Sequence, residues 1–351
     1  MHEYRQTTNV MTPIPKYDDN EIRNALSERI LRVTEGSFDE LALDIFRYQF
    51  TYNPIYQEFC RLLNIDVRKV QEPNEIPFLP IALFKNRDIS TNEWKPEVVF
   101  ESSTTTGQQP SRHAVRDLTF YRKISRRGFA SVTGHAITDF LWLALLPSYV
   151  DRPVSSLISM VSYFISEGKP GSRFISMDDA GEILRRADRG LFPVAFISVS
   201  FALLDLAEMM KIPLHHTTII ETGGMKGRRS ELTRQELHER ICIDFDVSTV
   251  YSEYGMTELL SQGWSTGEGI FHPSPSLRIL IRDLSDPMNL LKEHSRGAIN
   301  CIDLANLDTC AFIATDDVGM LHENGGFEVL GRFDASELRG CNLMVDQGRN
   351  E

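Results

Sequence analysis

The amino-acid sequence alternates between segments with helical spacing of apolar residues and short, continuous apolar runs. Helical spacing covers residues 19–32 and 38–63, and Asn53-Pro54 interrupts the second segment. Three later runs have the length of buried strands: 140–146, 192–199 and 216–220. Five segments with helical spacing accompany them: 117–132, 155–166, 178–189, 201–210 and 230–242. Such alternation predicts an α/β protein with a mainly parallel sheet covered by helices on both faces.

The two ends of the chain differ from this central pattern. Near the N-terminus, aromatic residues at helical spacing predict a helical cap that packs on the main body, with an acyl-chain or partner surface as the alternative. From Phe271 onward, four shorter β-like runs follow: 277–281, 297–304, 310–314 and 327–330. Turn-forming residues occur at 316–319 and 323–326. We therefore predict four parts: a helical cap at 1–75, an α/β body at 76–270, a β-rich lobe at 271–334 and a tail at 335–351.

Composition narrows the class of protein. The chain has 351 residues, of which 42% are apolar and 25% charged, as in ordinary globular proteins. Its 49 acidic and 37 basic residues give a net charge of −12, which argues against a nucleic-acid partner. No apolar run approaches the roughly 18 residues of a membrane span, and no signal-peptide core is present, so we expect a cytoplasmic protein. The five cysteines form no CxxC pair, which argues against a disulfide framework or a zinc site.

The stretch 98–112 contains the strongest candidate for a ligand-binding loop. Three apolar β-forming residues lead into five hydroxyl residues at 102–106, and Gly107 and Arg112 follow. If the strand belongs to the parallel sheet, its carboxyl end delivers hydroxyls, freed N–H groups and a cation to a polyanion. A Ser/Thr-rich surface turn is the alternative, and the Gly-Lys-Ser/Thr of a Walker loop is missing. His113 is either a further phosphate contact or a satisfied polar residue.

Polar groups also follow two other predicted strands. The paired Gly223 and Gly224 permit a flat ring or a sugar to approach the backbone closely, although a simple turn explains them as well. Thr257 and Glu258 place a hydroxyl beside a carboxylate, which suits phosphate and a hard divalent cation. The alternative is that this pair caps a helix starting at Leu259.

In the β-rich lobe, the acidic pair Asp316-Asp317 lies within a predicted turn. Either carboxylate can accept hydrogen bonds from ribose hydroxyls. The alternative is that both are solvated turn residues.

Five short motifs occur in an order that resembles the adenylate-forming superfamily of acyl-CoA synthetases, luciferase-type enzymes and peptide-synthetase adenylation domains. SSTTTGQQPSR resembles its phosphate loop, TGGMK its adenine-side loop, YGMTE its magnesium and α-phosphate motif, TDDVG its ribose motif, and GRFD its hinge. The short chain and its terminal RGCN resemble the LuxE-type acyl-protein synthetases, which are related to phenylacetate-CoA ligases. This resemblance implies a large N-terminal-type adenylate-forming domain with a smaller β-rich lobe and without the mobile C-terminal lobe.

The resemblance also implies roles for individual residues. It assigns the nucleotide to these contacts: pyrophosphate at Thr105, Thr106 and Gly107, adenine at Gly223, Gly224 and Tyr254, and ribose at Asp317. It assigns the chemistry to these residues: Thr257 at the α-phosphate, Glu258 as the Mg²⁺ ligand, Arg332 at ribose or phosphate, Asp334 at the hinge and Cys341 as acyl acceptor. Arg112 stands where the phosphate loop usually has lysine, and with Lys226 and Arg332 it is a candidate to replace the lysine of the absent lobe.

The function implied by this resemblance has two steps. A carboxylic acid, expected to be a fatty acid, is activated with ATP and Mg²⁺ to acyl-AMP, and the acyl group then passes through Cys341 to a partner protein such as a reductase. One alternative is a phenylacetate-CoA-ligase-like enzyme that transfers the acyl group directly to CoA or a carrier-protein thiol. The other is a nucleotide-binding protein without catalytic activity.

Overall fold

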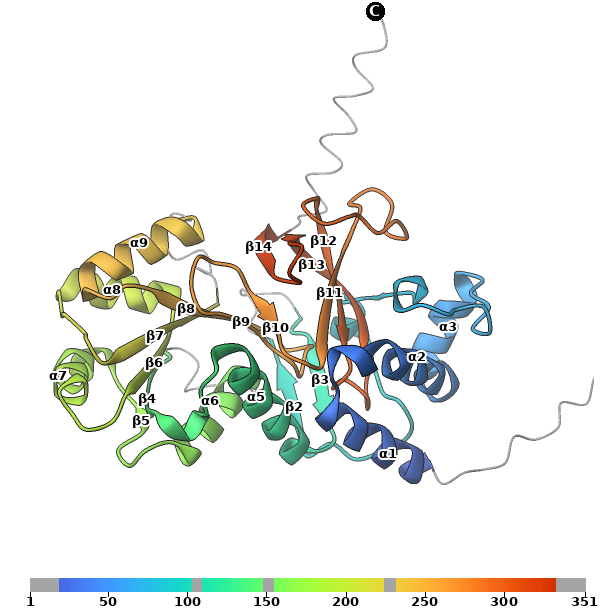
Figure 1. The fold of residues 1–351 in the computed structure, drawn as a ribbon. Helices are drawn as coiled ribbons and strands as arrows, with labels where there is room; N and C mark the ends of the chain where they lie inside the picture. The colour runs from blue at the N-terminus through green and yellow to red at the C-terminus, as the bar shows by residue number, and fades with distance from the viewer. Residues whose placement is uncertain (1–18, 103–108, 148–154, 224–231, 333–351) are drawn as a thin grey trace, which may run out of the picture.

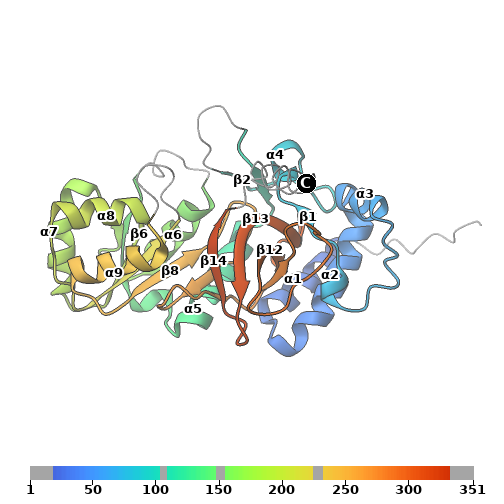
Figure 2. The same ribbon diagram turned by 90° about the horizontal axis from the view of Figure 1, so that it is seen from above.

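The computed structural model describes residues 19–102, 109–147, 155–223 and 232–332. These residues form two lobes side by side, one built on a seven-stranded sheet and the other on a five-stranded sheet (Figures 1 and 2). A separate hairpin of β2 (Val98–Glu101) and β3 (Arg112–Val115) lies near the junction of the lobes. The α/β class and the smaller β-rich lobe are therefore confirmed.

The seven-stranded sheet has the order β10-β9-β8-β7-β6-β4-β5. Its parallel strands are β4 (Leu141–Leu145), β5 (Arg173–Phe174), β6 (Val194–Val199), β7 (Thr217–Thr222) and β8 (Val250–Tyr254). The short strands β9 (Gly263–Ser265) and β10 (His272–Pro273) extend one edge in antiparallel fashion. Every residue of β6 is buried, because a central parallel strand is covered on both faces. This explains why such strands read as continuous apolar runs.

Helices cover both sides of this sheet. They are α5 (Leu118–Thr133), α6 (Ser156–Glu167), α7 (Met177–Asp188), α8 (Ser200–Met209) and α9 (Arg234–Phe245). Figure 1 shows α8 and α9 on the opposite side of the sheet from α5 and α6. Local chemistry sets the ends: Asp117 accepts from the Phe120 N–H at the start of α5, and Gly134 ends it with φ +75°. The start of α9 differs from the predicted residue 230, because Thr233 and Glu236 form a capping box there.

The five-stranded sheet combines an antiparallel series with one parallel strand. The antiparallel strands are β11 (Leu277–Arg282), β12 (Arg296–Asp303), β13 (Phe312–Leu321) and β14 (Phe327–Arg332). Strand β1 (Leu79–Pro80) pairs in parallel with β13. The predicted turn at 316–319 is wrong, because β13 continues through these residues while pairing with both β12 and β14. The predicted turn at 323–326 is confirmed, with Gly325 at φ +76°.

The N-terminal helices pack against this second sheet (Figure 1). They are α1 (Asp19–Arg32), α2 (Glu35–Tyr52) and α3 (Pro54–Leu62), and the short α4 (Leu83–Asn86) follows. The predicted interruption is confirmed: Asn53 caps α3 by accepting from the Tyr56 N–H, and Pro54 occupies the first helical position. The aromatic stripe is core, because the rings of Phe46 and Tyr56 lie 6.1 and 5.9 Å from the ring of Phe312. The alternative of an acyl-chain surface is therefore wrong for these side chains.

The prediction that the hydroxyl-rich loop follows a strand of the parallel sheet is wrong. In the described residues, β2 pairs with β3 in an antiparallel hairpin, from Val98 opposite Val115 to Glu101 opposite Arg112. Residues 103–108, which connect the two strands, lie outside the described part of the chain. The second strand was missed because only four residues, Arg112–Val115, carry its pattern.

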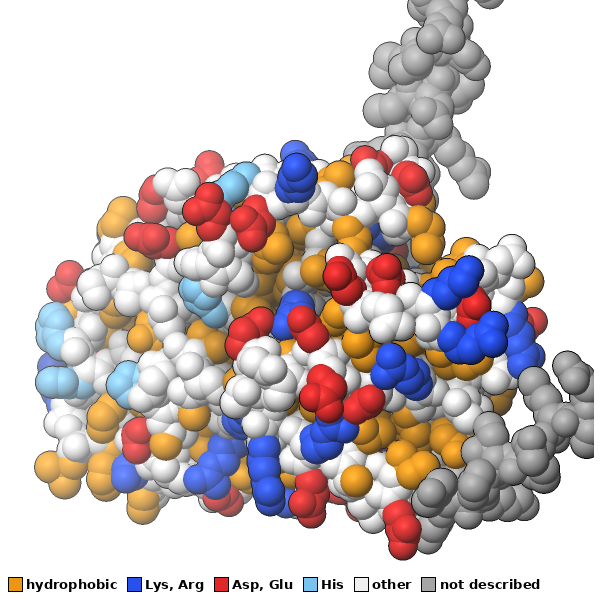
Figure 3. Space-filling view, turned by 45° about the vertical axis from the view of Figure 1, so that its right-hand side comes forward, with side chains coloured by type: hydrophobic (Ala, Val, Ile, Leu, Met, Phe, Trp, Pro, Cys, Tyr) orange, Lys and Arg blue, Asp and Glu red, His pale blue; other side chains and the backbone are white. Residues whose placement is uncertain are grey.

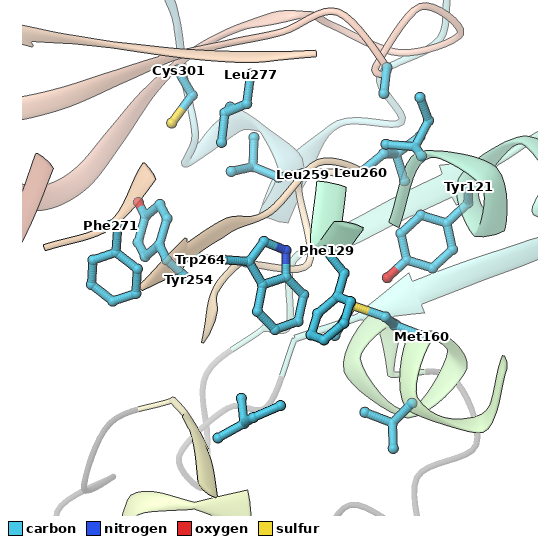
Figure 4. Close-up of a cluster of buried hydrophobic side chains, with 14 of the residues drawn as sticks. Tyr121, Phe129, Met160, Tyr254, Leu259, Leu260, Trp264, Phe271, Leu277 and Cys301 are labelled. Carbon is cyan, nitrogen blue, oxygen red and sulfur yellow. The ribbon is translucent and has the colours of Figure 1, made fainter. Parts of the chain in front are cut away.

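An apolar core runs continuously through both lobes. Figure 4 shows Phe129, Trp264 and Tyr254 from the first lobe beside Leu277 and Cys301 from the second. The rings of Phe129 and Trp264 meet edge to face at 5.2 Å. At the surface, the face in Figure 3 carries interspersed acidic and basic side chains, and apolar side chains line a hollow near its middle. Among the described helices, none is both long and apolar enough to cross a membrane.

One buried ion pair fastens α1 to the loop between β12 and β13. Arg23 donates to both carboxylate oxygens of Asp308 at 3.0 and 2.7 Å, and the two side chains are only 8% and 12% exposed. Replacing Asp308 with alanine leaves this arginine charge buried without its partner. We expect the free energy of unfolding to fall by about 3 kcal/mol in urea titrations. The matched control Asp66→Ala breaks the exposed pair with Arg68 and should lower the free energy of unfolding far less, because water screens exposed charges. Equal losses in the two variants would contradict this interpretation.

Candidate active site

Strand β8 delivers its last residue, Tyr254, to the junction between the lobes. The Tyr254 hydroxyl donates to Asp317 Oδ2 at 2.9 Å, and Arg332 Nε donates to the other oxygen of Asp317 at 3.2 Å. Asp317 and Arg332 are cross-strand partners in β13 and β14. The Arg332 side chain is 77% exposed, whereas that of Asp317 is 10% exposed. The structure thus brings together three predicted site residues from three strands.

The Tyr254 ring is held by aromatic neighbours. It lies 5.9 Å from the Phe271 ring and 5.4 Å from the Phe327 ring, and Figure 4 shows it beside Phe271. Burial, followed by the negative charge of Asp317, raises the pKa of the Tyr254 hydroxyl. The hydroxyl therefore remains a proton donor to that carboxylate. The predicted stacking of this ring on adenine stays a prediction.

Thr257 and Glu258 lie in a turn directly after β8. The Leu259 N–H donates to the Met256 carbonyl at 3.1 Å, and the chain then continues to β9. The alternative that this pair caps a helix is therefore wrong. Asp303 stabilises the backbone that follows the turn. Its buried carboxylate accepts hydrogen bonds from the N–H groups of Leu260 and Ser261 at 2.7 and 2.9 Å. A carboxylate that takes several such donors fixes the local backbone.

Glu258 places a buried carboxyl group in this turn. The residue is 6% exposed, and burial raises the pKa of its carboxyl group. A hydrogen bond from Ser111 and the positive charge of Arg332 act in the opposite direction, and Asp317 lies close enough for its charge to contribute. Glu258, Arg332 and Asp317 therefore share one electrostatic environment.

The donor set fits a magnesium ion that arrives with a nucleotide. Mg²⁺ is commonly held by one or two carboxylates together with phosphate oxygens and water. Glu258 supplies such a carboxylate. Burial raises its pKa and so favours the protonated form, whereas a neighbouring cation favours the ionised form. Within the described residues, no group of three or more His, Cys, Asp or Glu side chains is arranged to hold a metal by itself. The residues therefore suit a shared site rather than a protein-only cage.

The predicted phosphate side is described only in part. Thr105, Thr106 and Gly107 lie outside the described residues. Arg112 lies on the exposed side of β3, with its guanidinium 3.3 Å from Asp88 and 3.8 Å from Glu101. Its role at phosphate remains a prediction.

The predicted adenine side is also partly described. Gly223 follows β7 with φ +75°, a left-handed conformation that glycine adopts without strain. Its carbonyl accepts a hydrogen bond from Ser200, and the space where a Cβ would lie is open. Gly224 lies outside the described residues, as do Asp334 and Cys341 at the other end of the chain.

Two buried carboxylates at the ends of β7 and β8 were not predicted as site residues. Glu221 shares the Ser200 hydroxyl with the Gly223 carbonyl and lies 4.0 Å from the Arg234 guanidinium. Glu253 accepts from the Thr222 hydroxyl. Burial raises the pKa of both carboxyl groups, that of Glu253 to about 7. The available signal in the sequence was a glutamate at the end of each β-forming run.

His113 is a fully satisfied core residue. Its Nδ1 lies 2.8 Å from the Thr257 carbonyl oxygen, and its Nε2 lies 2.9 Å from the Thr309 hydroxyl. Burial lowers the pKa of the imidazole to about 4, so the ring is neutral at pH 7. The phosphate-contact interpretation is wrong, because both ring nitrogens bond to protein atoms.

Comparison with solved structures identifies the fold of this chain. Neither protein-family models nor curated protein sequences gave a match. Among solved structures, an open conformation of 2-hydroxyisobutyryl-CoA ligase in complex with 2-HIB-AMP and CoA aligns with a TM-score of 0.63 at 12% identity, over 94% of this chain and 76% of that one. This chain has the fold of that ligase.

Two further solved structures share this fold over shorter alignments. An ATP-bound RpMatB–BxBclM chimaera aligns with a TM-score of 0.52 at 16% identity, over 70% of this chain and 49% of its own. A long-chain-fatty-acid–CoA ligase from Archaeoglobus fulgidus aligns with a TM-score of 0.50 at 14% identity, over 71% and 53%. The chain thus spans about half the length of these two proteins.

Within the ligase fold, Glu253 should make stability depend on pH. Burial first, and the charge of Glu221 second, raise its pKa from 4.5 to about 7, against the hydrogen bond from Thr222. A raised pKa in the folded state means that stability is lost as pH rises from 4.5 through 7. Glu253→Gln removes this titration, so between pH 5 and pH 8 the variant should gain about 2–3 kcal/mol relative to wild type in urea unfolding. Parallel pH profiles for the two proteins would refute the assignment.

Proposed function

We propose that this protein activates a carboxylic acid with ATP to an acyl-adenylate and then transfers the acyl group to a thiol. The observation that carries the proposal is that Asp317 and Arg332, paired in the second lobe, lie near enough to Glu258 of the first lobe for their charges to act on its carboxyl group. The fold supports it, because one similar structure is a 2-hydroxyisobutyryl-CoA ligase in complex with 2-HIB-AMP and CoA, and another is the ATP-bound RpMatB–BxBclM chimaera. The family resemblance of the five motifs agrees with both observations.

The first step joins the acid to AMP. An oxygen of the substrate carboxylate attacks the α-phosphorus of ATP, an acyl–oxygen–phosphorus bond forms, and the bond to pyrophosphate breaks. Asp317 orients the exposed Arg332 guanidinium, which can neutralise charge on the nucleotide. Glu258 holds the cation site, and Mg²⁺ supplies charge neutralisation for the leaving pyrophosphate when bound. The chain itself provides no nucleophile in this step.

The second step is proposed to use Cys341. Its thiolate attacks the acyl carbonyl, a carbon–sulfur bond forms, the bond to the AMP oxygen breaks, and the thiol proton is released. Three described cysteines, Cys60, Cys301 and Cys310, are buried, and burial raises the pKa of each thiol. Thiolate formation is disfavoured at these positions, which supports a nucleophile elsewhere. A fatty acid as substrate and a reductase or other acyl-accepting protein as partner complete this proposal.

A second candidate is direct transfer of the acyl group to CoA. The 2-hydroxyisobutyryl-CoA ligase, whose fold aligns over 94% of this chain, is described in complex with 2-HIB-AMP and CoA. In this version CoA supplies the thiol, and Cys341 has no catalytic role.

Replacing Cys341 with serine separates the two candidates. We expect acid-dependent ATP–pyrophosphate exchange to survive in this variant, because adenylation precedes thiol attack. Covalent labelling by a radioactive acid should vanish on denaturing gels. Cys242→Ser, at a partly buried cysteine, is the matched control and should keep the label. Labelling that persists without Cys341 would contradict the thioester, and formation of acyl-CoA would favour the second candidate.

Replacing Glu258 with glutamine tests the adenylation step itself. The change removes the ionisable oxygen while keeping the shape, so exchange should fall by about 100-fold or more and require more Mg²⁺. Glu328→Gln, which alters a carboxylate paired with His322, should leave exchange unchanged. Thermal melting of both variants checks that they fold. ATP binding by wild-type protein without exchange across fatty and aromatic acids would instead indicate a nucleotide-binding protein without this activity.

A further inference from the structure

We propose that His113 is a positioning residue that holds the Thr257–Glu258 turn in place through the Thr257 carbonyl. The inference rests on the proposed function, since that turn carries the expected cation and α-phosphate contacts. It goes beyond the family resemblance, which assigns His113 no role. Its basis is a set of hydrogen bonds that reaches the turn from two sides.

The chemistry of its partners determines which nitrogen of the His113 ring carries the proton. A backbone carbonyl only accepts, so Nδ1 must be the donor in the 2.8 Å contact with Thr257. In the neutral ring Nε2 is then the acceptor, and the Thr309 hydroxyl donates to it at 2.9 Å. The ring is 1% exposed and meets Phe84 edge to face at 5.7 Å. Packing and both hydrogen bonds therefore select one orientation.

Thr309, the hydrogen-bond partner of His113 Nε2, is itself fixed by several hydrogen bonds. Its backbone carbonyl accepts from Asn53 Nδ2 at 2.8 Å, from Thr91 Oγ1 at 2.6 Å and from Gln49 Nε2 at 3.3 Å. These donors come from the N-terminal helical region and the chain that follows it. The position of Thr309, and with it the imidazole, is thus set by α2 and its surroundings.

A second contact reaches the turn from the same loop. Asn306 Nδ2 donates to the Glu258 carbonyl oxygen at 2.7 Å, and the Asn306 carbonyl accepts from Gln49 at 2.9 Å. The consecutive carbonyls of Thr257 and Glu258 are therefore both fixed by protein donors. A turn anchored at two adjacent peptide groups has little freedom to rotate its side chains away.

The β2–β3 hairpin also contacts the Thr257–Glu258 turn. Ser111 and His113 lie on the buried side of the chain entering β3, whereas Arg112 between them is exposed. His113 bonds to the Thr257 carbonyl, and Ser111 lies close enough to the Glu258 carboxyl group to favour its ionised form. One short segment thus faces both the backbone and the side chain of the turn.

The test compares two amide substitutions of His113. In His113→Asn the side-chain N–H lies as many bonds from the backbone as Nδ1, so it can still donate to Thr257. In His113→Gln the amide reaches toward Thr309 instead. We expect kcat of ATP–pyrophosphate exchange to stay within about threefold of wild type in the Asn variant and to fall about 100-fold in the Gln variant, with the KM for the acid unchanged.

Controls separate positioning from loss of stability. Asp188→Asn weakens hydrogen bonds to the N–H groups of His215 and His216 at the opposite end of β7, so it should destabilise the protein while leaving exchange unchanged. Thr309→Val removes the Nε2 partner but spares the Thr257 contact, and its loss of kcat should be smaller than that of His113→Gln. Equal activity in the Asn and Gln variants, or activity that follows unfolding free energy across all four variants, would overturn the inference.

Hydrogen–deuterium exchange of the peptide covering 255–261 distinguishes failure of this inference from failure of the proposed function. We expect faster exchange there in His113→Gln than in His113→Asn, whether or not the protein adenylates an acid. That difference in a protein without pyrophosphate exchange would reject only the proposed function. Pyrophosphate exchange in wild type, with unchanged peptide protection in both variants, would reject only the role of His113.

Discussion

The hydrogen bond from Tyr254 to Asp317 is the contact on which the candidate site depends. It joins the carboxyl end of β8 in one sheet to the middle of β13 in the other, at 2.9 Å. Both side chains are largely buried, and a buried hydroxyl or carboxylate without a partner is costly. The Tyr254–Asp317 hydrogen bond therefore aligns the two lobes. The Asp317 carboxylate also accepts a hydrogen bond from Arg332, whose side chain is exposed to solvent.

The residues around this contact show how the fold supports a polar site inside an apolar junction. The aromatic rings of Phe271 and Phe327 enclose Tyr254, and each is fully buried. The Asp303 carboxylate accepts hydrogen bonds from N–H groups just after the turn that follows β8. Asn306 and His113 donate hydrogen bonds to the backbone carbonyls of that turn. Few of these groups are expected to touch a ligand. Instead, they limit the motion of the side chains that are expected to touch it, and a preorganised site requires such restriction.

The sequence predicted much of the fold because its signals were local. The bounds of α1 were predicted residue for residue, and the break between α2 and α3 followed from the Asn53-Pro54 cap. Continuous burial on both faces explains why β6 was visible as an apolar run. The hairpin of β2 and β3 was not predicted, because a short strand with one exposed face leaves a weak pattern. Acidic residues and glycine favour a turn at 316–319, yet pairing with β12 and β14 keeps this segment in β13.

The sequence by itself determined the class of the fold, the order of its elements and the motifs that resemble adenylate-forming enzymes, since each depends on neighbouring residues. Only the tertiary structure decided that Glu258, Asp317 and Arg332 share one environment, because their proximity comes from the packing of two sheets. It also decided the state of His113, whose burial and two partners come from segments 144 and 196 residues away. Composition carries no record of such contacts: desolvation and hydrogen bonding act only once the chain is folded.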